Sequence, residues 1–246
     1  MRKILLVSGC SYTDKNFRSD FHPDIDTSWP KWPELLGKKL NMEVVNYGYC
    51  GSGNEYIYNS IINHLADGIE NIGLVIAGWT RVPRRDFKVG ERKFNIRWDN
   101  HGDMKYFQMK TLMYQYSFQQ VCKSLNLPYK QIHILDPYES AVVEQNEMYG
   151  EDKHLQKQQW SMNNPYMVNQ LDRKYDRTDA MRTLVNSPYF KSIDEKTFIG
   201  WPIEPKLGGF CAWDKLDKDN HFISDLDRHP NRKGQEVIME LIHENL

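Results

Sequence analysis

Apolar and polar residues alternate along the first part of the chain in two kinds of segment, each with its own period. Short apolar runs are typical of buried strands, and four of them occur, at residues 3–8, 43–46, 73–77 and 131–135. Between these runs, apolar residues recur every third or fourth position, which indicates helices with one buried face, at residues 32–40, 53–67 and 104–125. This order of strands and helices predicts an α/β fold, a parallel sheet with helices on both faces. Ligands of such sheets bind beyond the carboxyl ends of the strands.

Two regions depart from the alternation. Residues 86–98 predict a β-hairpin, with Gly90 and Glu91 as its two-residue turn. Residues 137–220 are polar, with helical patterns near 139–160 and 171–184, and we expect an insertion that caps an edge or the active face of a single domain spanning residues 1–246. A last helix is predicted at residues 232–244, with Asn231 as its N-cap.

Charge and cysteine content narrow the class of protein. Lys and Arg total 32 against 33 Asp and Glu, and this balance argues against a dedicated nucleic-acid or membrane-surface binder. No apolar run approaches the length of a membrane span, and no cleavable signal is evident. We therefore expect a soluble cytoplasmic protein. Association with a virion, or release on lysis, stays open as an alternative. Four cysteines without CxxC spacing indicate free thiols, and for Cys10 and Cys50 two buried thiols are favoured over a disulfide.

A serine lies on a tight turn after the first predicted strand. Gly9 permits the bend, and the turn would expose the Ser11 hydroxyl and leave backbone N–H groups unpaired. A nucleophile must occupy such a position to reach a substrate. The alternative is a plain strand-to-loop turn in which Ser11 is a local cap.

Three glycines, at positions 48, 51 and 53, follow the second predicted strand and would let the backbone approach a ligand closely. Ser52 and Glu55 have the spacing of a capping box, which predicts a helix start whose free N–H groups suit an anion or an oxyanion. The pattern is not GxGxxG and does not follow the first strand, which argues against a dinucleotide site. A glycine-rich helix entry without a ligand is the alternative.

Basic residues are concentrated after the third predicted strand. Seven lie between positions 81 and 97, against two acidic residues. This excess suits an anionic substrate, although one solvated hairpin face is the more common explanation. Nucleic-acid binding through this stretch ranks last, because the net charge of the whole chain is −1.

A carboxylate and a histidine precede the last predicted helix. Asp227 stands two residues before His229, which suits a base held in one tautomer by an acid. An acid at this position also suits the N-terminus of a helix. Metal binding ranks lower, because only one histidine is well placed. The loop around His22, with Asp24 and Asp26, has no second cluster to support a metal site and is interpreted as surface.

Taken together, these segments resemble the SGNH (GDSL-type) hydrolases. Gly-Cys-Ser-Tyr-Thr at residues 9–13 resembles block I of that family, Asn-x-Gly-x-x-Gly at 46–51 resembles block II, and Asp-x-His-Pro-Asn at 227–231 resembles block V. Their order and spacing across the chain agree with the family. The resemblance implies a three-layer, flavodoxin-like sheet.

The resemblance also implies a serine esterase with an acyl-enzyme intermediate and no metal or cofactor. Ser11 is expected to be the nucleophile and His229 the base. In the family at large the acid stands three residues before the histidine, where this chain has Leu226. A shorter Asp-x-His-Pro form occurs in a phage-borne branch, so Asp227 is the expected acid, with Asp225 in reserve.

An oxyanion hole is expected from the N–H groups of Ser11 and Gly51. The block III asparagine of the family is absent, and this chain has Thr80 there, within a Trp-Thr-x-x-x-Arg pattern that resembles the same branch. Thr80 is the expected third donor, with Asn54 in reserve. Loss of one such donor costs on the order of a hundredfold in rate.

The expected substrate is a small acyl ester, acetyl before others, and an acetylated saccharide is the first choice. Aromatic residues that suit sugar stacking lie in the insertion, at Trp160, Tyr189, Phe190, Trp201, Phe210 and Trp213. The expected substrate contacts are Trp79, Arg84 and Trp201. The alternatives are that the aromatics form the insertion's own core, and that the protein is a catalytically lapsed carbohydrate-binding or virion-associated module. Neither nucleic acid nor a membrane is an expected partner.

Overall fold

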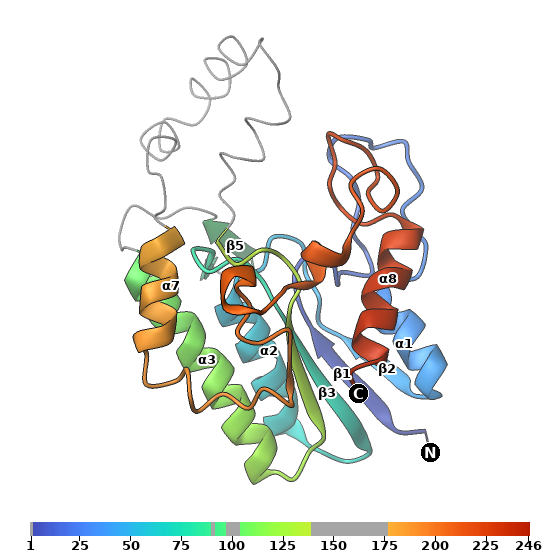
Figure 1. Ribbon diagram of the computed structural model, residues 1–246. Helices are drawn as coiled ribbons and strands as arrows, with labels where there is room; N and C mark the ends of the chain where they lie inside the picture. Colours follow the sequence, from blue (N-terminus) through green and yellow to red (C-terminus); the bar gives the residue numbers. More distant parts are fainter. Residues whose placement is uncertain (1, 90–91, 97–103, 139–176) are drawn as a thin grey trace.

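The computed structural model describes residues 2–89, 92–96, 104–138 and 177–246. Its centre is a sheet of five parallel strands in the order β2-β1-β3-β6-β7 (Figure 1). The strands are β1 (Ile4–Ser8), β2 (Glu43–Asn46), β3 (Ile72–Trp79), β6 (Tyr129–His133) and β7 (Phe198–Ile199). The helices are α1 (Trp32–Leu40), α2 (Asn54–Asp67), α3 (Met104–Ser124), α7 (Arg177–Asn186) and α8 (Arg232–His243).

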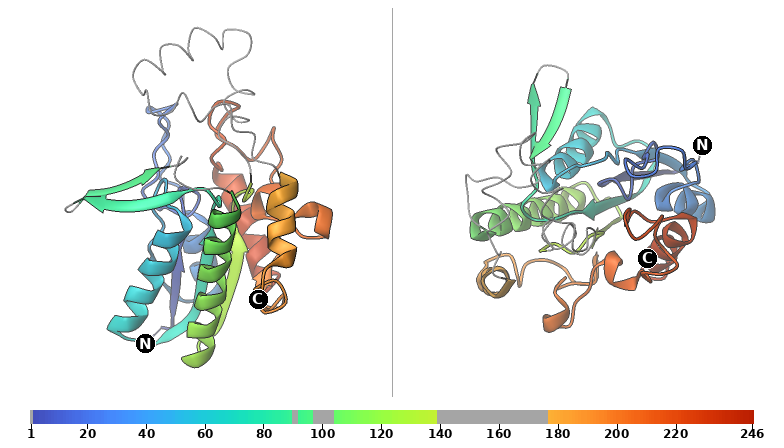
Figure 2. Two further views of the ribbon diagram at one scale, coloured as in Figure 1. Left: turned by 90° about the vertical axis from the view of Figure 1, so that its left-hand side faces the viewer. Right: turned by 90° about the horizontal axis from the view of Figure 1, so that it is seen from above.

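Helices cover both faces of the sheet, as Figures 1 and 2 show. Successive side chains of β1 point to opposite faces, so Leu5 packs in one core and Leu6 in the other. The first core contains Trp32 of α1 and Ile238 of α8, and the second contains Ile57 of α2 and residues of α3. Helix α7 packs on α3. The molecule is therefore a three-layer α/β structure with flavodoxin-like strand order, as the sequence predicts.

The boundaries of most predicted elements are confirmed within a few residues. The hairpin is confirmed as β4 (Arg85–Val89) and β5 (Arg92–Ile96), with Phe87 opposite Phe94, and its predicted turn lies outside the described residues. Asn231 is confirmed as the N-cap of α8, since its side chain accepts from the Gly234 N–H at 3.1 Å. The helical pattern at 139–160 lies outside the described residues.

Strand β7 is an element that the sequence pattern does not predict. It pairs in parallel with β6, with Phe198 opposite Gln131, and so extends the sheet from within the 137–220 stretch. A strand of two residues is too short to show a period of its own. Two 3-10 turns follow, η1 (Pro205–Leu207) and η2 (Ala212–Lys215). Within the described ranges, none of the helices has both the length and the apolar character needed to cross a membrane.

Candidate active site

The candidate residues meet beyond the carboxyl edge of the sheet. Ser11 follows β1, Gly51 lies between β2 and α2, and Thr80 follows β3. Because these three strands are parallel neighbours, their following loops lie at the same edge. Asp227 and His229 belong to the segment before α8, more than 200 residues further along the chain.

Ser11, His229 and Asp227 form a continuous hydrogen-bonded chain. The Ser11 Oγ lies 2.9 Å from His229 Nε2, and His229 Nδ1 lies 2.5 Å from Asp227 Oδ1. A carboxylate can only accept, so the imidazole proton lies on Nδ1 and leaves Nε2 to accept the Ser11 hydroxyl proton. The backbone N–H of His229 also donates to Asp227 Oδ1, at 3.1 Å. This arrangement can activate a hydroxyl as a nucleophile.

Two aromatic rings of the loop that carries Ser11 contact the imidazole of His229. The ring of Phe17 stacks on it, with centroids 4.1 Å apart and planes at 30°. Tyr12 approaches at 5.4 Å, and its hydroxyl donates to the carbonyl of Arg228. The segment after β1 therefore supplies Ser11 and also holds the histidine that contacts it. Neither aromatic residue was predicted, because a loop has no period that would mark its side chains.

Asp227 is buried, and its side chain is 1% exposed against 29% for His229. Burial by itself would raise the pKa of the Asp227 carboxyl. The hydrogen bond from the His229 ring and the imidazolium charge outweigh this effect and hold the pKa of Asp227 below its ordinary value. The carboxylate is therefore ionised at neutral pH. By contrast, Asp225 is exposed.

The loop after β2 is fastened to the turn that carries Ser11. Asn46 Nδ2 donates to the Thr13 carbonyl at 2.8 Å, and Asp14 Oδ2 accepts from the Cys50 N–H at 2.9 Å. The two backbones approach so closely that a Cβ on Gly48 would lie 2.6 Å from the carbonyl carbon of Thr13. Only glycine fits that contact. Asp14 was not predicted as part of the site.

Several backbone N–H groups at this junction have no hydrogen-bond partner within the described part of the chain, among them those of Ser11 and Gly51. Gly51 has a φ of 76°, in the left-handed region that favours glycine. Both residues are buried. Unpaired buried N–H groups are rare in folded proteins, and they commonly serve a ligand or a transition state. Of the two N–H groups, one belongs to the residue that carries the hydroxyl and the other to the loop bonded to its turn, and such donors suit an oxyanion.

The start of α2 differs from the predicted capping box. The helix begins at Asn54 with Gly53 as N-cap, and the Ser52 hydroxyl donates to the Tyr49 carbonyl instead of capping the helix. The carboxylate of Asp86 takes that role from the hairpin, accepting from the N–H groups of Gly53 (2.9 Å) and Tyr56 (2.9 Å). A cap supplied from 30 residues away cannot be read from local spacing. The N-terminus of α2 is therefore already occupied by a negative charge.

Thr80 and Asn54, the expected third donor and its reserve, are both buried and bonded to each other. The Thr80 N–H donates to Asn54 Oδ1 at 2.8 Å, and Asn54 Nδ2 donates to the Thr80 carbonyl at 3.2 Å. The Thr80 hydroxyl accepts from Arg84 Nη1 at 2.9 Å. Asn54 Nδ2 therefore already has partners, and its amide serves to fix the loop after β3.

The three expected substrate contacts lie in different surroundings. Trp79 is fully buried, and its indole N–H donates to Gln131 at 3.0 Å. Its ring packs edge-on to Phe118. Trp79 is therefore a core residue, which corrects the expectation that it contacts substrate. Arg84 joins two loops, because Nη1 also donates to the Ser52 carbonyl at 3.2 Å. Trp201 is half-buried against Phe198, with ring centroids 5.1 Å apart.

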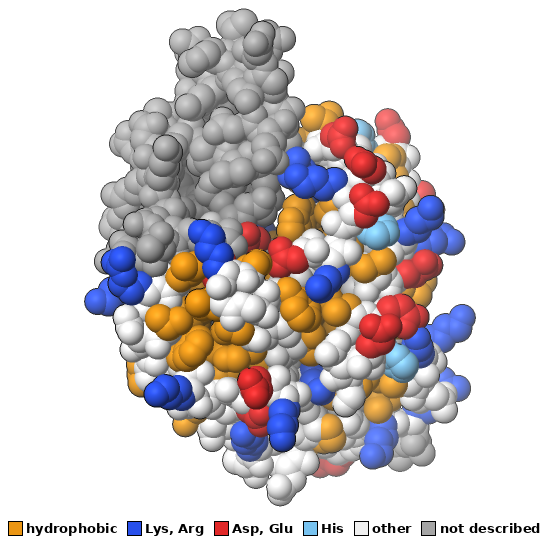
Figure 3. Space-filling view, viewed as in Figure 1, with side chains coloured by type: hydrophobic (Ala, Val, Ile, Leu, Met, Phe, Trp, Pro, Cys, Tyr) orange, Lys and Arg blue, Asp and Glu red, His pale blue; other side chains and the backbone are white. Residues whose placement is uncertain are grey.

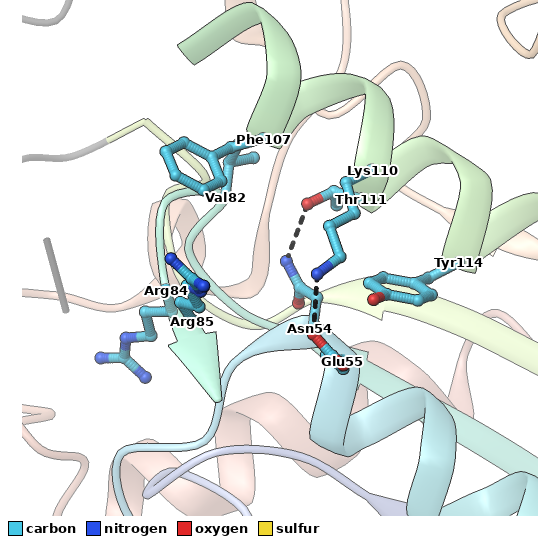
Figure 4. A pocket seen from close by; sticks show the side chains of 9 residues that line it. All are labelled: Asn54, Glu55, Val82, Arg84, Arg85, Phe107, Lys110, Thr111 and Tyr114. Carbon is cyan, nitrogen blue, oxygen red and sulfur yellow. Dashed lines mark hydrogen bonds and ion pairs between the residues drawn. The ribbon is translucent and has the colours of Figure 1, made fainter. Parts of the chain in front are cut away.

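Arg84 also lines a small pocket beside the start of α2, shown in Figure 4. The pocket is small, with a volume of about 20 Å³, and α2, α3 and the loop after β3 supply its walls. Lys110 Nζ lies 2.8 Å from Glu55 Oε2, so this pair is compensated, while Arg84 and Arg85 leave the lining net positive.

The described aromatics of the predicted insertion pack mainly against the rest of the protein. Tyr189, Phe190 and Trp201 pack on the second core, and Phe210 and Trp213 pack on the first; Trp160 lies outside the described residues. Apolar side chains gather on the face seen in Figure 3, and charged side chains of both signs are spread over the rest of it. The free thiol of Cys10 is buried, whereas that of Cys50 is exposed, which corrects the expectation of two buried thiols.

Comparison with known proteins gives structural neighbours only. No protein-family model matches the chain, and no curated protein matches it. A solved protein of the G-D-S-L lipolytic family from Desulfitobacterium hafniense DCB-2 is similar over 100% of both chains, at 13% identity and a TM-score of 0.46. The psychrotrophic esterase EstA from Pseudoalteromonas sp. is similar over 100% of this chain and 96% of its own, at 12% identity and a TM-score of 0.44.

A variant of Axe2, an acetyl xylan esterase from Geobacillus stearothermophilus, is similar over 99% of this chain and 94% of its own. Its identity is 13% and its TM-score 0.43. These identities and TM-scores are low, so the chemistry of this chain is inferred from its own side chains.

Proposed function

We propose that this protein is a serine ester hydrolase that acts on a small acyl ester, acetyl in the first instance. The observation that carries the proposal is the chain of contacts from Ser11 Oγ through His229 to Asp227, 2.9 and 2.5 Å long. Each contact has the length of a good hydrogen bond, and each atom has the role that acyl transfer requires.

The mechanism begins with attack of Ser11 Oγ on the acyl carbonyl carbon, while His229 Nε2 takes the hydroxyl proton. Asp227 holds the imidazole in the Nδ1–H tautomer and stabilises its charged form. The N–H groups of Ser11 and Gly51 donate to the oxyanion of the tetrahedral intermediate. His229 then gives its proton to the leaving alkoxide, which departs as the alcohol.

The second half of the reaction repeats these steps with water. His229 Nε2 takes a proton from the water, which attacks the acyl carbon of the Ser11 ester. The acid product leaves, and the proton returns to Ser11 Oγ. The two backbone donors serve both tetrahedral intermediates, and no step requires a metal or cofactor.

We propose an acetylated saccharide as the substrate. The loop that carries Phe17 surrounds a hollow of about 390 Å³, and Phe17, whose ring stacks on His229, forms part of its wall. The lining combines the cations Lys15 and Arg18 with the acids Asp24 and Asp26. Donors and acceptors of this kind suit a polyol. Trp201, half-buried after β7, is the proposed stacking platform.

Hydrolysis of p-nitrophenyl acetate tests the proposal, with acetylated oligosaccharides as the second set of substrates. We expect Ser11→Ala to abolish release of p-nitrophenol while the protein keeps its thermal unfolding transition. Activity of Ser11→Ala close to that of the wild type would exclude Ser11 as the nucleophile. Binding of unmodified oligosaccharide by an inactive wild type would favour the second candidate, a carbohydrate-binding module.

A further inference from the structure

The hydroxyl of Ser224 shapes the turn that carries the candidate acid. Its Oγ accepts the N–H of Asp227 at 3.0 Å and the N–H of Leu226 at 3.2 Å. The N–H of Ser224 in turn donates to the Asp227 carbonyl at 3.2 Å. The backbone position of Asp227, and through it the place of His229, therefore depends on the orientation of one hydroxyl.

A histidine from the nucleophile's loop is the third partner of that hydroxyl. His22 Nε2 lies 2.6 Å from Ser224 Oγ. A serine hydroxyl has two acceptor sites and one proton, and the two backbone N–H groups occupy both acceptor sites. The Ser224 proton must therefore be donated to His22 Nε2. This requires a neutral His22 ring with its own proton on Nδ1.

His22 is held firmly enough to act in this way, although its loop was interpreted from the sequence as surface. The residue is half-buried, its N–H donates to Ser19 Oγ at 2.9 Å, and its carbonyl accepts from the Ile25 N–H at 3.1 Å. No ion pair within the described ranges involves His22. The sequence pattern could not show this contact, because its partner stands 202 positions away.

We propose that His22 is a positioning residue that holds the acid–histidine turn in its active geometry through Ser224. The expected effect of His22 on the rate of ester hydrolysis rests on the proposed function, whereas its effect on the turn does not. A protonated His22 carries donors on both ring nitrogens and cannot accept the Ser224 proton. The contact then breaks, and the turn loses one of its fixed points.

Several titratable residues stand on the two segments that meet at this contact. Asp227 and His229 are joined to it through the turn itself. Asp20 and Asp24 stand beside His22 in sequence and Asp225 beside Ser224, and none of these acids forms an ion pair with His22 in the described structure. Among the described residues, the ring of His22 is therefore joined to the turn through Ser224 and not through an ion pair.

The test is the pH profile of kcat/KM for p-nitrophenyl acetate in the wild type, His22→Gln and His22→Ala. Glutamine can still accept through its amide oxygen and does not titrate, so at about pH 8 His22→Gln is expected to lie within about twofold of the wild type. His22→Ala is expected to fall by about threefold to tenfold, the value of one hydrogen bond.

The decisive quantity is the ratio of wild-type to His22→Gln activity across the pH range. Once acidification protonates His22, this ratio is expected to fall by about threefold to tenfold, because the glutamine keeps its acceptor. The matched control is His64→Gln, whose ring contacts Tyr47 Oη at 3.1 Å, and it should leave the profile unchanged. Parallel profiles of the wild type and His22→Gln would overturn the inference.

A second readout separates this inference from the proposed function. If the wild type hydrolyses no ester, the function fails, and ¹⁵N NMR of the imidazoles still decides the role of His22. We expect the Nδ1–H tautomer for His22, and a shifted Asp227 amide resonance in His22→Ala. An Nε2–H tautomer together with an unmoved Asp227 amide would overturn the inference.

Discussion

At the scale of single residues, the site depends on which hydrogen-bond partner each polar group has. Asp227 is almost wholly buried and bonded to the His229 ring and its N–H, whereas Asp225, the reserve acid, is exposed. The sequence alone left these two acids open, because both precede the histidine within four residues. Contact, burial and the lowered pKa of Asp227 all favour the same residue.

The pair of substitutions Asp227→Asn and Asp225→Asn tests this assignment. An amide at position 227 can donate to His229 Nδ1 and so favours the wrong tautomer, and we expect the rate of p-nitrophenyl acetate hydrolysis to fall on the order of a thousandfold or more. Asp225→Asn, at an exposed position, should change the rate less than about twofold. Equal losses in the two variants would contradict the assignment.

The lowered pKa of Asp227 also predicts the pH dependence of stability. The folded state favours the ionised carboxylate, so the ionised Asp227 stabilises the fold. This stabilisation is fully present above the unfolded-state pKa of about 3.9, and it is lost as the pH falls through the lower pKa of the folded state. The difference in unfolding free energy between wild type and Asp227→Asn should therefore shrink below about pH 4. Urea denaturation at neutral and acidic pH measures it. A difference that grows on acidification would be the opposite of this expectation.

At the scale of elements, the loops after β1 and β2 and the start of α2 form one bonded unit. Asp14 joins the first loop to the second, and Asp86 joins the hairpin to α2. These contacts fasten the segment that contains Gly51 to the loop that carries Ser11. The backbone of this unit is therefore as important to the proposed chemistry as its side chains.

Substitution of Gly51 by alanine tests the backbone requirement. At φ 76° an alanine is strained by about 1–2 kcal/mol, and the chain is expected to relax by moving the Gly51 N–H. Gly208→Ala is a matched control, since Gly208 has φ 87° and an added Cβ would meet nothing within 4 Å. We expect similar losses of stability in both variants, measured by thermal unfolding, and loss of esterase activity only in Gly51→Ala. Full activity of Gly51→Ala would argue against its N–H as an oxyanion donor.

Removal of the remote cap tests the role of Asp86. Asp86→Ala leaves the N–H groups of Gly53 and Tyr56 without their acceptor, and we expect a loss of about 1 kcal/mol in unfolding free energy with a lower rate of ester hydrolysis. Asp67→Ala, at the exposed last residue of the same helix, should be neutral or slightly stabilising, because an acid opposes the dipole there. Urea denaturation measures the free energy of unfolding of the two variants. Equal destabilisation would exclude a specific capping role.

At the scale of the whole molecule, the sequence was sufficient for the main layers and insufficient for the contacts between loops. The periods of residues 32–40, 53–67 and 104–125 predicted three helices, since an amphipathic face leaves a regular pattern. Strand β7 has only two residues and leaves none. Contacts such as Phe17 on His229, or His22 with Ser224, join residues about 200 positions apart, and no local pattern encodes them.

Labelling with a fluorophosphonate probe, followed by mass spectrometry of the modified peptide, shows whether Ser11 is an activated nucleophile. The probe reacts with a serine hydroxyl only when a base activates it. We expect one adduct, on Ser11, that is lost in His229→Ala. Absence of an adduct on folded wild-type protein, or an adduct that persists in His229→Ala, would contradict this expectation.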